Sequence, residues 1–364
     1  MAEPWPNPTG ALLTIDLGAL QDNWRTMRGH ARAARCGAAV KADAYGLGLT
    51  RAGQALFEAG CDCYFVSQAE EGAALRPHVG PSDIYVLNGV REAALPVHAS
   101  HTLKPVLNSL NDIELWKKAG IDLPAALHID TGMARLGLSQ SEVAALIADP
   151  SWKDGLRLDC VMSHLSSADL PASPVNAEQK RNFDAARAAL GLHDVPASLA
   201  NSAGILLGDD YHYDLVRPGL ALYGANPVHS KSSPVRQTVR LEAEIVQIRH
   251  VDAKTAVGYG AAHTALEATR IATIPVGYGD GYPRTLSHVA VADVSGHRVP
   301  VIGRISMDLI TLDVGGVPED VAHLGARVTL IGGPIEIGQL ARQAGTVSYE
   351  LLTNLSRRIT RRYV

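Results

Sequence analysis

One apolar run near the start of this 364-residue chain ends on a lysine, in the stretch CGAAVKADAYGLG from Cys36 to Gly48. The small and β-branched residues up to Val40 indicate a buried strand, and Lys41 stands at its end. A lysine that is desolvated or flanked by cations loses its proton readily and becomes a nucleophile for an aldehyde. A lysine at a strand end can equally reach solvent or an acidic partner, so its position alone leaves both interpretations open.

Other candidate residues also stand at the ends of the apolar runs. They are Tyr45 after the first run, Arg135 after the fifth, His164 after the sixth, Asn201 and Ser202 after the seventh, and Arg217, Gly219 and Tyr223 at the eighth. The segments NSAG and RPGLALYG occupy the places where α/β barrels often bind phosphate through backbone N–H groups. Pyridoxal 5'-phosphate would use the lysine, the phosphate site and a residue against its ring nitrogen together.

Eight strand-like runs position these groups within residues 1–230. They are CGAAVK, CYFVS, DIYVLNG, LKPVLN, AALHID, LDCVMSH, PASLANS and LVRPGLALYG. Segments of helical character separate most of them, and each run is apolar throughout, which is typical of a parallel sheet covered on both faces. Eight such strands close a barrel, so we expect a (β/α)8 TIM-like barrel with its functional groups at the C-terminal strand ends.

A second domain is expected over residues 231–364. After the polar junction KSSPVRQT, the chain is rich in Val, Thr, Ile and Gly with few helical periods, which predicts short strands and glycine turns. The strand-like LLTID near the N-terminus could belong to either domain. The arginine-rich end, SRRITRRYV, is expected to finish a helix in solvent.

Composition excludes several classes of function. The 33 Lys and Arg against 37 Asp and Glu give a formal charge of −4, which favours neither nucleic acid nor an anionic membrane as partner. Four cysteines in no zinc-like spacing predict reduced, mostly buried thiols and no metal site. The N-terminus lacks a signal-peptide pattern and no apolar run is long enough for a bilayer span, so we expect a cytoplasmic protein.

The order of short motifs resembles the alanine racemase family. The motifs are VKADAYGLG, DTGMARLG, MSHLSSAD, NSAG, VRPGLALYG, VGYG, IPVGYGDGYPR, GRISMD and TVSYE. They cover nearly the whole chain and divide between the expected barrel and the expected β domain. The resemblance implies an isomerase that interconverts L-alanine and D-alanine by a two-base mechanism on a pyridoxal-phosphate aldimine. It also implies a homodimer with shared active sites, and a role in D-alanine supply for peptidoglycan or in alanine catabolism.

The resemblance also implies a role for each matching residue. Lys41 would hold the cofactor and act as one catalytic base, and Tyr259 of a second subunit would be the other. Cofactor contacts would come from Tyr45, Arg135, His164, Asn201, Ser202, Arg217, Gly219, Leu220 and Tyr349. Arg135 and Met307 would contact the substrate, and Asp169, Tyr278 and Arg284 would line the access channel.

Elementary chemistry supports the two central roles. Racemisation removes a proton from one face of the α carbon and delivers one to the other face, so two bases must flank it. An arginine such as Arg217 stays protonated and discourages protonation of the pyridine nitrogen, which weakens the electron sink and suppresses transamination. A decarboxylase or aminotransferase would usually place a carboxylate there.

One position departs from the pattern. Many relatives have a carbamylated lysine two residues before the aspartate of DTGM, where it is thought to orient the arginine, and this chain has His128. A histidine forms no carbamate, so Arg135 must be held by another group, such as a bound anion or a neighbouring amide. A milder departure is Ser306, where cysteine often precedes the pocket methionine.

Three alternative functions remain open from the sequence. A broader-specificity racemase would keep both bases, and a decarboxylase or aldolase on the same barrel would share Lys41. A non-catalytic cofactor carrier would resemble residues 1–230 and lack the domain that supplies Tyr259. The sequence does not decide between biosynthetic and catabolic roles, nor whether serine is a substrate.

Overall fold

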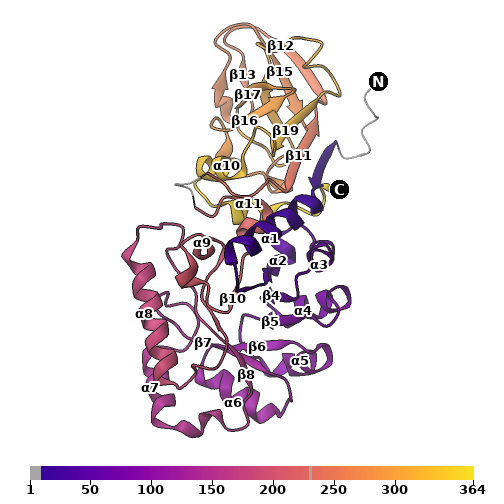
Figure 1. The fold of residues 1–364 in the computed structure, drawn as a ribbon. Coiled ribbons are helices and arrows are strands. Elements are labelled where there is room, and N and C mark those ends of the chain that lie inside the picture. The colour runs from indigo at the N-terminus through magenta and orange to yellow at the C-terminus, as the bar shows by residue number, and fades with distance from the viewer. Residues whose placement is uncertain (1–9, 229–231) are drawn as a thin grey trace. The chain divides into compact units, whose positions relative to one another are not determined.

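The computed structural model describes residues 10–228 and 232–364, which divide into two compact units (Figure 1). The barrel unit is Leu20–Arg236, and the β unit combines the described residues up to Ala19 with Gln237–Val364. The boundary expected after residue 230 falls near the end of the barrel unit, whereas the first described residues of the chain belong to the β unit.

Parallel strands form the centre of the barrel unit. They are β2 (Arg35–Cys36), β3 (Ala38–Ala39), β4 (Cys63–Val66), β5 (Asp83–Val86), β6 (Lys104–Leu107), β7 (Ala125–His128), β8 (Leu158–Met162), β9 (Ala197–Ser198) and β10 (Leu215–Val216). Strands β3 to β9 pair in sequence order, and β10 pairs with β2. The ring closes because a bridge joins Asn201 to Arg217 and because only Gly37 separates β2 from β3. The predicted (β/α)8 barrel followed by a β-rich domain is therefore confirmed.

Helices surround this ring. They are α1 (Leu17–Ala31), α2 (Lys41–Tyr45), α3 (Leu49–Glu58), α4 (Ala69–Leu75), α5 (Leu95–His101), α6 (Leu110–Ala119), α7 (Gln140–Ala148), α8 (Pro174–Ala189) and α9 (Ser202–Ile205). In Figure 1, α3, α4, α5 and α8 lie outside the strands. Inside, Phe65 stacks on Tyr85 in a buried cluster that includes Val106, Cys160 and Met162, so the barrel is a packed core. All four cysteines are buried free thiols. In the two described ranges, no helix has the length and apolar character of a bilayer span.

A nine-stranded sheet dominates the β unit, in the order β12-β15-β18-β17-β16-β19-β11-β1-β20. Its strands are β1 (Ala11–Ile15), β11 (Val239–Glu244), β12 (Gln247–Val251), β15 (Thr269–Ile274), β16 (Val291–Val294), β17 (His297–Ile302), β18 (Ile310–Asp313), β19 (Arg327–Ile331) and β20 (Thr360–Tyr363). A hairpin of β13 (Ala256–Val257) and β14 (His263–Thr264) and the helices α10 (Ile337–Ala344) and α11 (Ser348–Asn354) complete it.

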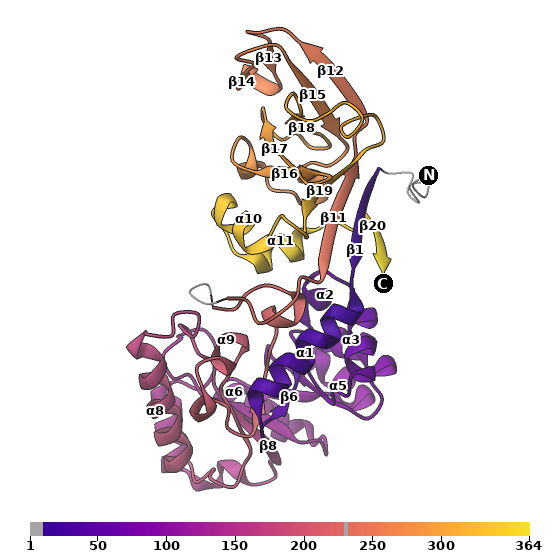
Figure 2. The same cartoon turned by 45° about the horizontal axis from the view of Figure 1, so that its top comes forward.

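The two ends of the chain meet in this sheet. Figure 2 shows β1 between β11 and β20, antiparallel to the first and parallel to the second. The LLTID segment thus belongs to the β unit. The expectation that SRRITRRYV finishes a helix is wrong, because residues 360–363 pair with β1 as a strand.

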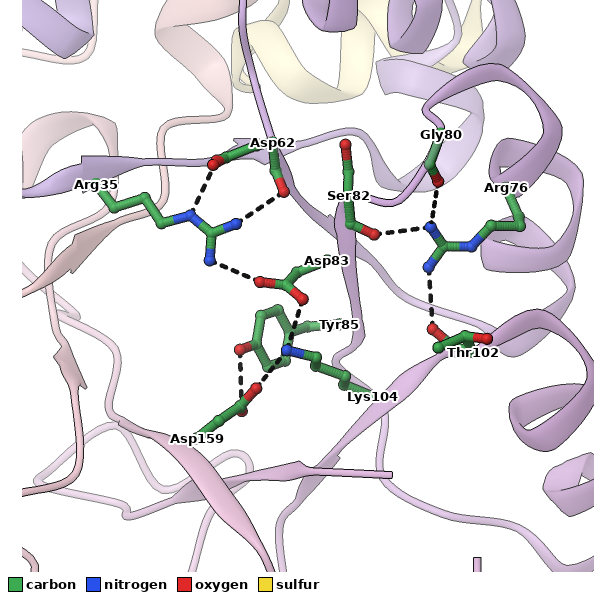
Figure 3. A network of polar contacts seen from close by, with 10 residues as sticks. All are labelled: Arg35, Asp62, Arg76, Gly80, Ser82, Asp83, Tyr85, Thr102, Lys104 and Asp159. Carbon is green, nitrogen blue, oxygen red and sulfur yellow. Dashed lines mark hydrogen bonds and ion pairs between the residues drawn. The ribbon is translucent and has the colours of Figure 1, made fainter. Parts of the chain in front are cut away.

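An ion-pair network lies at the N-terminal ends of the barrel strands, opposite the ends that carry Lys41 (Figure 3). The amine of Lys104 lies 2.5 Å from Asp83 Oδ1 and also contacts Asp159. Arg35 Nη1 contacts the other oxygen of Asp83 at 2.6 Å, and its Nε contacts Asp62 at 2.9 Å. Burial alone would raise the pKa of Asp83, but hydrogen bonds from Lys104 and Arg35 outweigh it and lower this pKa.

We expect this network to make the stability of the barrel sensitive to acid. A carboxyl whose folded pKa is depressed contributes stability above its unfolded pKa of about 4, and this contribution is lost as the pH falls through the folded value. Asp83→Asn should lower the free energy of unfolding by about 1–3 kcal/mol at pH 7. The loss should shrink towards pH 3, as measured by urea unfolding across pH. Asp122→Asn, which breaks an exposed pair with Arg157, should change little. Equal effects of the two variants would contradict the assignment.

Candidate functional site

Lys41 begins a backbone segment of unusual conformation. The four residues after it, Ala42, Asp43, Ala44 and Tyr45, have φ values of 54°, 55°, 52° and 56°, so α2 is a left-handed turn and not an ordinary helix. Each non-glycine residue in this conformation costs roughly 1–2 kcal/mol. Strain of this kind persists only where the surroundings impose it, and it concentrates at functional sites.

Local contacts maintain the turn. The backbone N–H of Gly46 donates to the carbonyl of Ala42 at 2.8 Å, and that of Gly48 donates to Asp43 at 2.9 Å. The Asp43 carboxylate accepts a hydrogen bond from the N–H of Leu49 at 2.8 Å, at the start of α3. The ring of Tyr45 stacks on Tyr223 with centroids 4.4 Å apart. These contacts fix the direction in which the chain leaves Lys41.

The surroundings of Lys41 make loss of its proton easier than in a free lysine. Burial lowers the pKa of its amine, the positive charges of Arg135 and Arg217 lower it further, and Glu71 opposes them. A neutral amine has a free lone pair and can attack a carbonyl carbon, whereas an ammonium group cannot. A lowered pKa is what the nucleophile interpretation requires, and the role of Lys41 stays a prediction.

Arg217 is a buried cation directly after β10, at the same ends of the barrel strands as Lys41. Its side chain donates hydrogen bonds to the hydroxyl of Ser198, to the carbonyl of Ser163 at 2.6 Å and to Nδ1 of His164 at 3.4 Å. Burial lowers the pKa of Arg217 to about 10, so it stays protonated at neutral pH. Burial, followed by the charge of Arg217, lowers the pKa of His164, which leaves a neutral ring whose Nδ1 accepts the hydrogen bond.

Asn201, Ser202, Gly219 and Ala221 lie together just after the ends of β9 and β10, and we call this group the cradle. The amide oxygen of Asn201 caps α9 by accepting the N–H of Gly204 at 2.9 Å. The hydroxyl oxygen of Ser202 accepts the N–H groups of Gly219 at 2.8 Å and Ala221 at 3.2 Å, which leaves its own proton free to donate.

Glycine at position 219 of this cradle makes room for the side chain of Tyr45. A Cβ there would lie 2.4 Å from the hydroxyl of Tyr45. Leu220 follows as a buried residue. Tyr45, Ser202, Gly219 and Leu220 are thus brought together as expected.

Arg135 lies on a loop that folds back on β7. One carboxylate oxygen of Asp130 accepts the N–H groups of Gly132, Met133 and Ala134, and Leu138 pairs with the backbone of His128. Arg135 itself is exposed. The loop therefore sets the position of Arg135 through its backbone.

His128 is held by an amide. Its Nδ1 lies 2.7 Å from Oδ1 of Asn108, whose Nδ2 donates to the carbonyls of Leu87 and Val106. These two donations orient the amide, so its oxygen faces His128 and Nδ1 must be the protonated ring nitrogen. Burial, together with the charge of Arg217, lowers the pKa of His128 to about 4, so the ring is neutral and its Nε2 is an acceptor.

The remaining expected residues lie elsewhere. Asp169 is an exposed loop residue of the barrel unit. Five others belong to the β unit, namely Tyr259, Tyr278, Arg284, Met307 and Tyr349. Within it, the N–H of Tyr278 donates to Ser306 at 3.0 Å and that of Gly279 donates to Met307 at 2.9 Å, so these two loops lie side by side. The side chain of Tyr259 is 70% exposed, that of Met307 53% and that of Tyr278 43%.

Sequence reasoning missed four residues that shape the site, namely Glu71, Asn108, Ser163 and Ser198. Asn108 ends the run LKPVLN, so the strand-end rule that selected Lys41 would also have selected it. Glu71 carries only the signal of a helix cap. Ser163 stands beside His164 at the end of the run LDCVMSH, so the same rule would have selected it, whereas Ser198 lies among apolar residues and carries no signal of its own.

Fold and site together define a class, a closed α/β barrel with a partly buried lysine and a buried arginine at its C-terminal strand ends, joined to a β-rich domain. The comparisons with known proteins agree with this class. The chain matches the alanine racemase N-terminal domain over residues 15–227 and the alanine racemase C-terminal domain over residues 238–363. The chain belongs to the alanine racemase family, and its activity is the interconversion of L-alanine and D-alanine.

Individual relatives match nearly the whole chain. An alanine racemase of Rhodospirillum rubrum is 47% identical, with 97% of this chain and 96% of the relative covered. A catabolic alanine racemase of Agrobacterium fabrum is 45% identical, covering 97% and 92%. The crystal structure of alanine racemase from Bartonella henselae, with covalently bound pyridoxal phosphate, superposes with a TM-score of 0.94 at 36% identity and covers 98% of this chain and 100% of that one.

Proposed function

We propose that the chain racemises alanine with pyridoxal 5'-phosphate held by Lys41, with Lys41 and the Tyr259 of a second copy as the two bases. The observation that carries the proposal is that Lys41 and the buried Arg217 stand at the same ends of the barrel strands, after β3 and β10. The charge of Arg217 is one of the causes that lower the pKa of Lys41. An amine nucleophile beside a cation suits a racemase, whereas an acid in that position would favour other reactions.

The residues at the barrel mouth fit this cofactor. Lys41 supplies an amine for its aldehyde carbon. The Ser202 hydroxyl has a proton to donate, and the glycine at position 219 lets the Tyr45 hydroxyl approach the same strand end, where both hydroxyls could contact a phosphate. By the family resemblance, Leu220 and Tyr349 would add further phosphate contacts, Asn201 would contact the cofactor, and His164 would support Arg217.

When bound, the cofactor withdraws electrons from the α carbon of alanine and makes its C–H bond acidic. Arg217 offers only donors and no proton to give up, so a ring nitrogen facing it stays unprotonated and the withdrawal stays limited. Arg135 would bind the substrate carboxylate as a cation on its fixed loop. Lys41 then accepts or delivers the α proton on its own face of the substrate.

The second face requires a second base. Tyr259 is 70% exposed in the β unit, and Met307 and Tyr278 are exposed with it. Large exposed side chains of this kind favour an interaction surface. We propose a head-to-tail homodimer in which Tyr259 and Met307 of each copy complete the barrel mouth of the other, with Tyr278, Arg284 and Asp169 along the channel to it.

Subunit mixing tests this shared site. Lys41→Ala and Tyr259→Phe homodimers should each be nearly inactive, whereas a heterodimer contains one complete site. Mixing them under conditions of subunit exchange should restore up to about a quarter of the wild-type activity per total subunit, as expected for random pairing. No recovery despite exchange shown by mass spectrometry would argue that each chain completes its own site.

The cellular role follows from the same reaction. Four buried free thiols support a reducing compartment, and we propose that the enzyme works in the cytoplasm. Agrobacterium fabrum has both a catabolic relative at 45% identity and a biosynthetic one at 40%. Either D-alanine supply for peptidoglycan or D-alanine breakdown is therefore consistent with these relatives. Complementation of a D-alanine auxotroph tests the supply role.

A further inference from the structure

The Glu71 carboxylate joins the strained turn after Lys41 to the end of the neighbouring strand, β4. Its Oε1 accepts a hydrogen bond from the N–H of Ala42 at 2.6 Å, on the first left-handed residue. Its Oε2 accepts the N–H groups of Ser67 at 2.8 Å and Gln68 at 3.2 Å, directly after β4. One carboxylate therefore ties two adjacent strand ends together at the mouth of the barrel.

A helix cap accounts for only half of this arrangement. Glu71 is the third residue of α4, and its Oε2 makes the backbone contact that a capping box requires. The bond from Oε1 to Ala42 lies outside the cap and connects residues 29 positions apart. Hydrogen bonds to a charged acceptor are about twice as strong as neutral ones, so this contact can hold a residue in a costly conformation.

The negative charge of the same carboxylate raises the pKa of the Lys41 amine. The charged or titratable groups that influence the amine come from separate elements, namely Arg135 on the loop after β7, Arg217 after β10, His164 after β8 and Glu71 on α4. His164 is neutral, so Glu71 is the negative charge in this set. Its charge limits how far the two arginines lower the pKa of Lys41.

We propose that Glu71 is a positioning residue for Lys41, which fixes the left-handed turn that aims the lysine and supplies the counter-charge to its nitrogen. This inference rests on the proposed function, because Lys41 must carry the cofactor for its aim to matter. It assigns to Glu71 a part in the reaction that a helix cap does not have.

The test compares Glu71→Gln, Glu71→Asp and the control Glu70→Gln in the holoenzyme. Glu70 is the preceding carboxylate on α4 and is exposed. Three quantities are measured, namely the pH midpoint of the visible absorption of the lysine-bound cofactor, the dissociation constant of pyridoxal phosphate after stripping, and kcat with KM.

Glu71→Gln removes the charge and leaves only one acceptor oxygen. Its pH midpoint should fall by about one unit, since a positive nitrogen loses its counter-charge. Its dissociation constant for the cofactor should rise about tenfold, and kcat should fall more than KM changes. Glu71→Asp keeps the charge but is shorter, so it should keep the midpoint and still lose cofactor affinity. Glu70→Gln should match the wild type in all three measurements.

A purely structural cap gives a different pattern. Glu71→Gln would then unfold more easily while its pH midpoint and cofactor affinity equal those of Glu70→Gln, and this result would overturn the inference. Unsubstituted protein that binds no cofactor would overturn the proposed function, and this inference with it. That failure is distinguishable because it appears before any substitution is made.

Discussion

Lys41→Ala is expected to yield a colourless protein with alanine racemisation reduced by at least about 10³-fold, the scale of losing a positioned base together with the cofactor anchor. The reason is local. Among the described residues, the groups named as acting on the Lys41 amine are the guanidiniums of Arg135 and Arg217, the imidazole of His164 and the carboxylate of Glu71, and none of these is an amine that could replace it. Absorbance spectra and borohydride reduction followed by peptide mass spectrometry measure the linkage directly.

Lys118→Ala is the matched control for this experiment. Lys118 is an exposed lysine on α6, and its removal should leave colour and activity unchanged. Circular dichroism should show that both variants keep the fold. A Lys41→Ala protein that still carries a borohydride-reducible cofactor linkage would contradict the assignment of Lys41.

Tyr259→Phe is expected to separate the two faces of the substrate. By the family resemblance, Lys41 serves D-alanine and Tyr259 serves L-alanine. The variant should therefore lose exchange of the α proton of L-alanine by about 10²–10⁴-fold, the usual contribution of a general base, while D-alanine still exchanges through Lys41. Each enantiomer is incubated with the variant in deuterated water, and the α-proton signal is followed by NMR.

Tyr363→Phe serves as the control for Tyr259→Phe. Tyr363→Phe removes a hydroxyl from β20 of the same unit and should leave both exchange rates unchanged. Equal loss of exchange for the two enantiomers in Tyr259→Phe, with the cofactor still bound, would show that Tyr259 is not specific to one face.

The parts of the site that the sequence predicts are those set by strand ends. Lys41, Arg217 and Ser202 each follow an apolar run, and parallel strands that close a barrel bring such positions to one rim. The eight runs predicted the barrel because fully buried strands need no alternation of polar residues. This reasoning requires only local patterns and one rule of topology.

The parts that were missed depend on contacts between distant segments. The left-handed turn over Ala42–Tyr45 is invisible in sequence, because alanine and aspartate rarely adopt positive φ unless other residues impose it. The bond from Glu71 to Ala42 and the placement of β1 beside β11 join residues far apart in the chain. Neither pairing follows from a local pattern.

His128 illustrates the same limit. The sequence suggested that an anion or a neighbouring amide would replace the function of a carbamylated lysine beside Arg135. In the structure, the amide of Asn108 contacts the histidine itself. Two backbone carbonyls orient that amide, and they are contributed by β6 and by the residue after β5. What holds the guanidinium of Arg135 when substrate binds stays a prediction.

The most direct test of the central claim uses the unsubstituted protein. Purified protein, loaded with pyridoxal phosphate, is incubated with L-alanine in deuterated water, and both the α-proton signal and the chirality of the alanine are followed over time. The two-base account predicts that the α-proton signal disappears, that D-alanine accumulates to equal amounts with L-alanine, and that no pyruvate forms. Retention of the α proton, or formation of pyruvate or ethylamine in place of D-alanine, would contradict it.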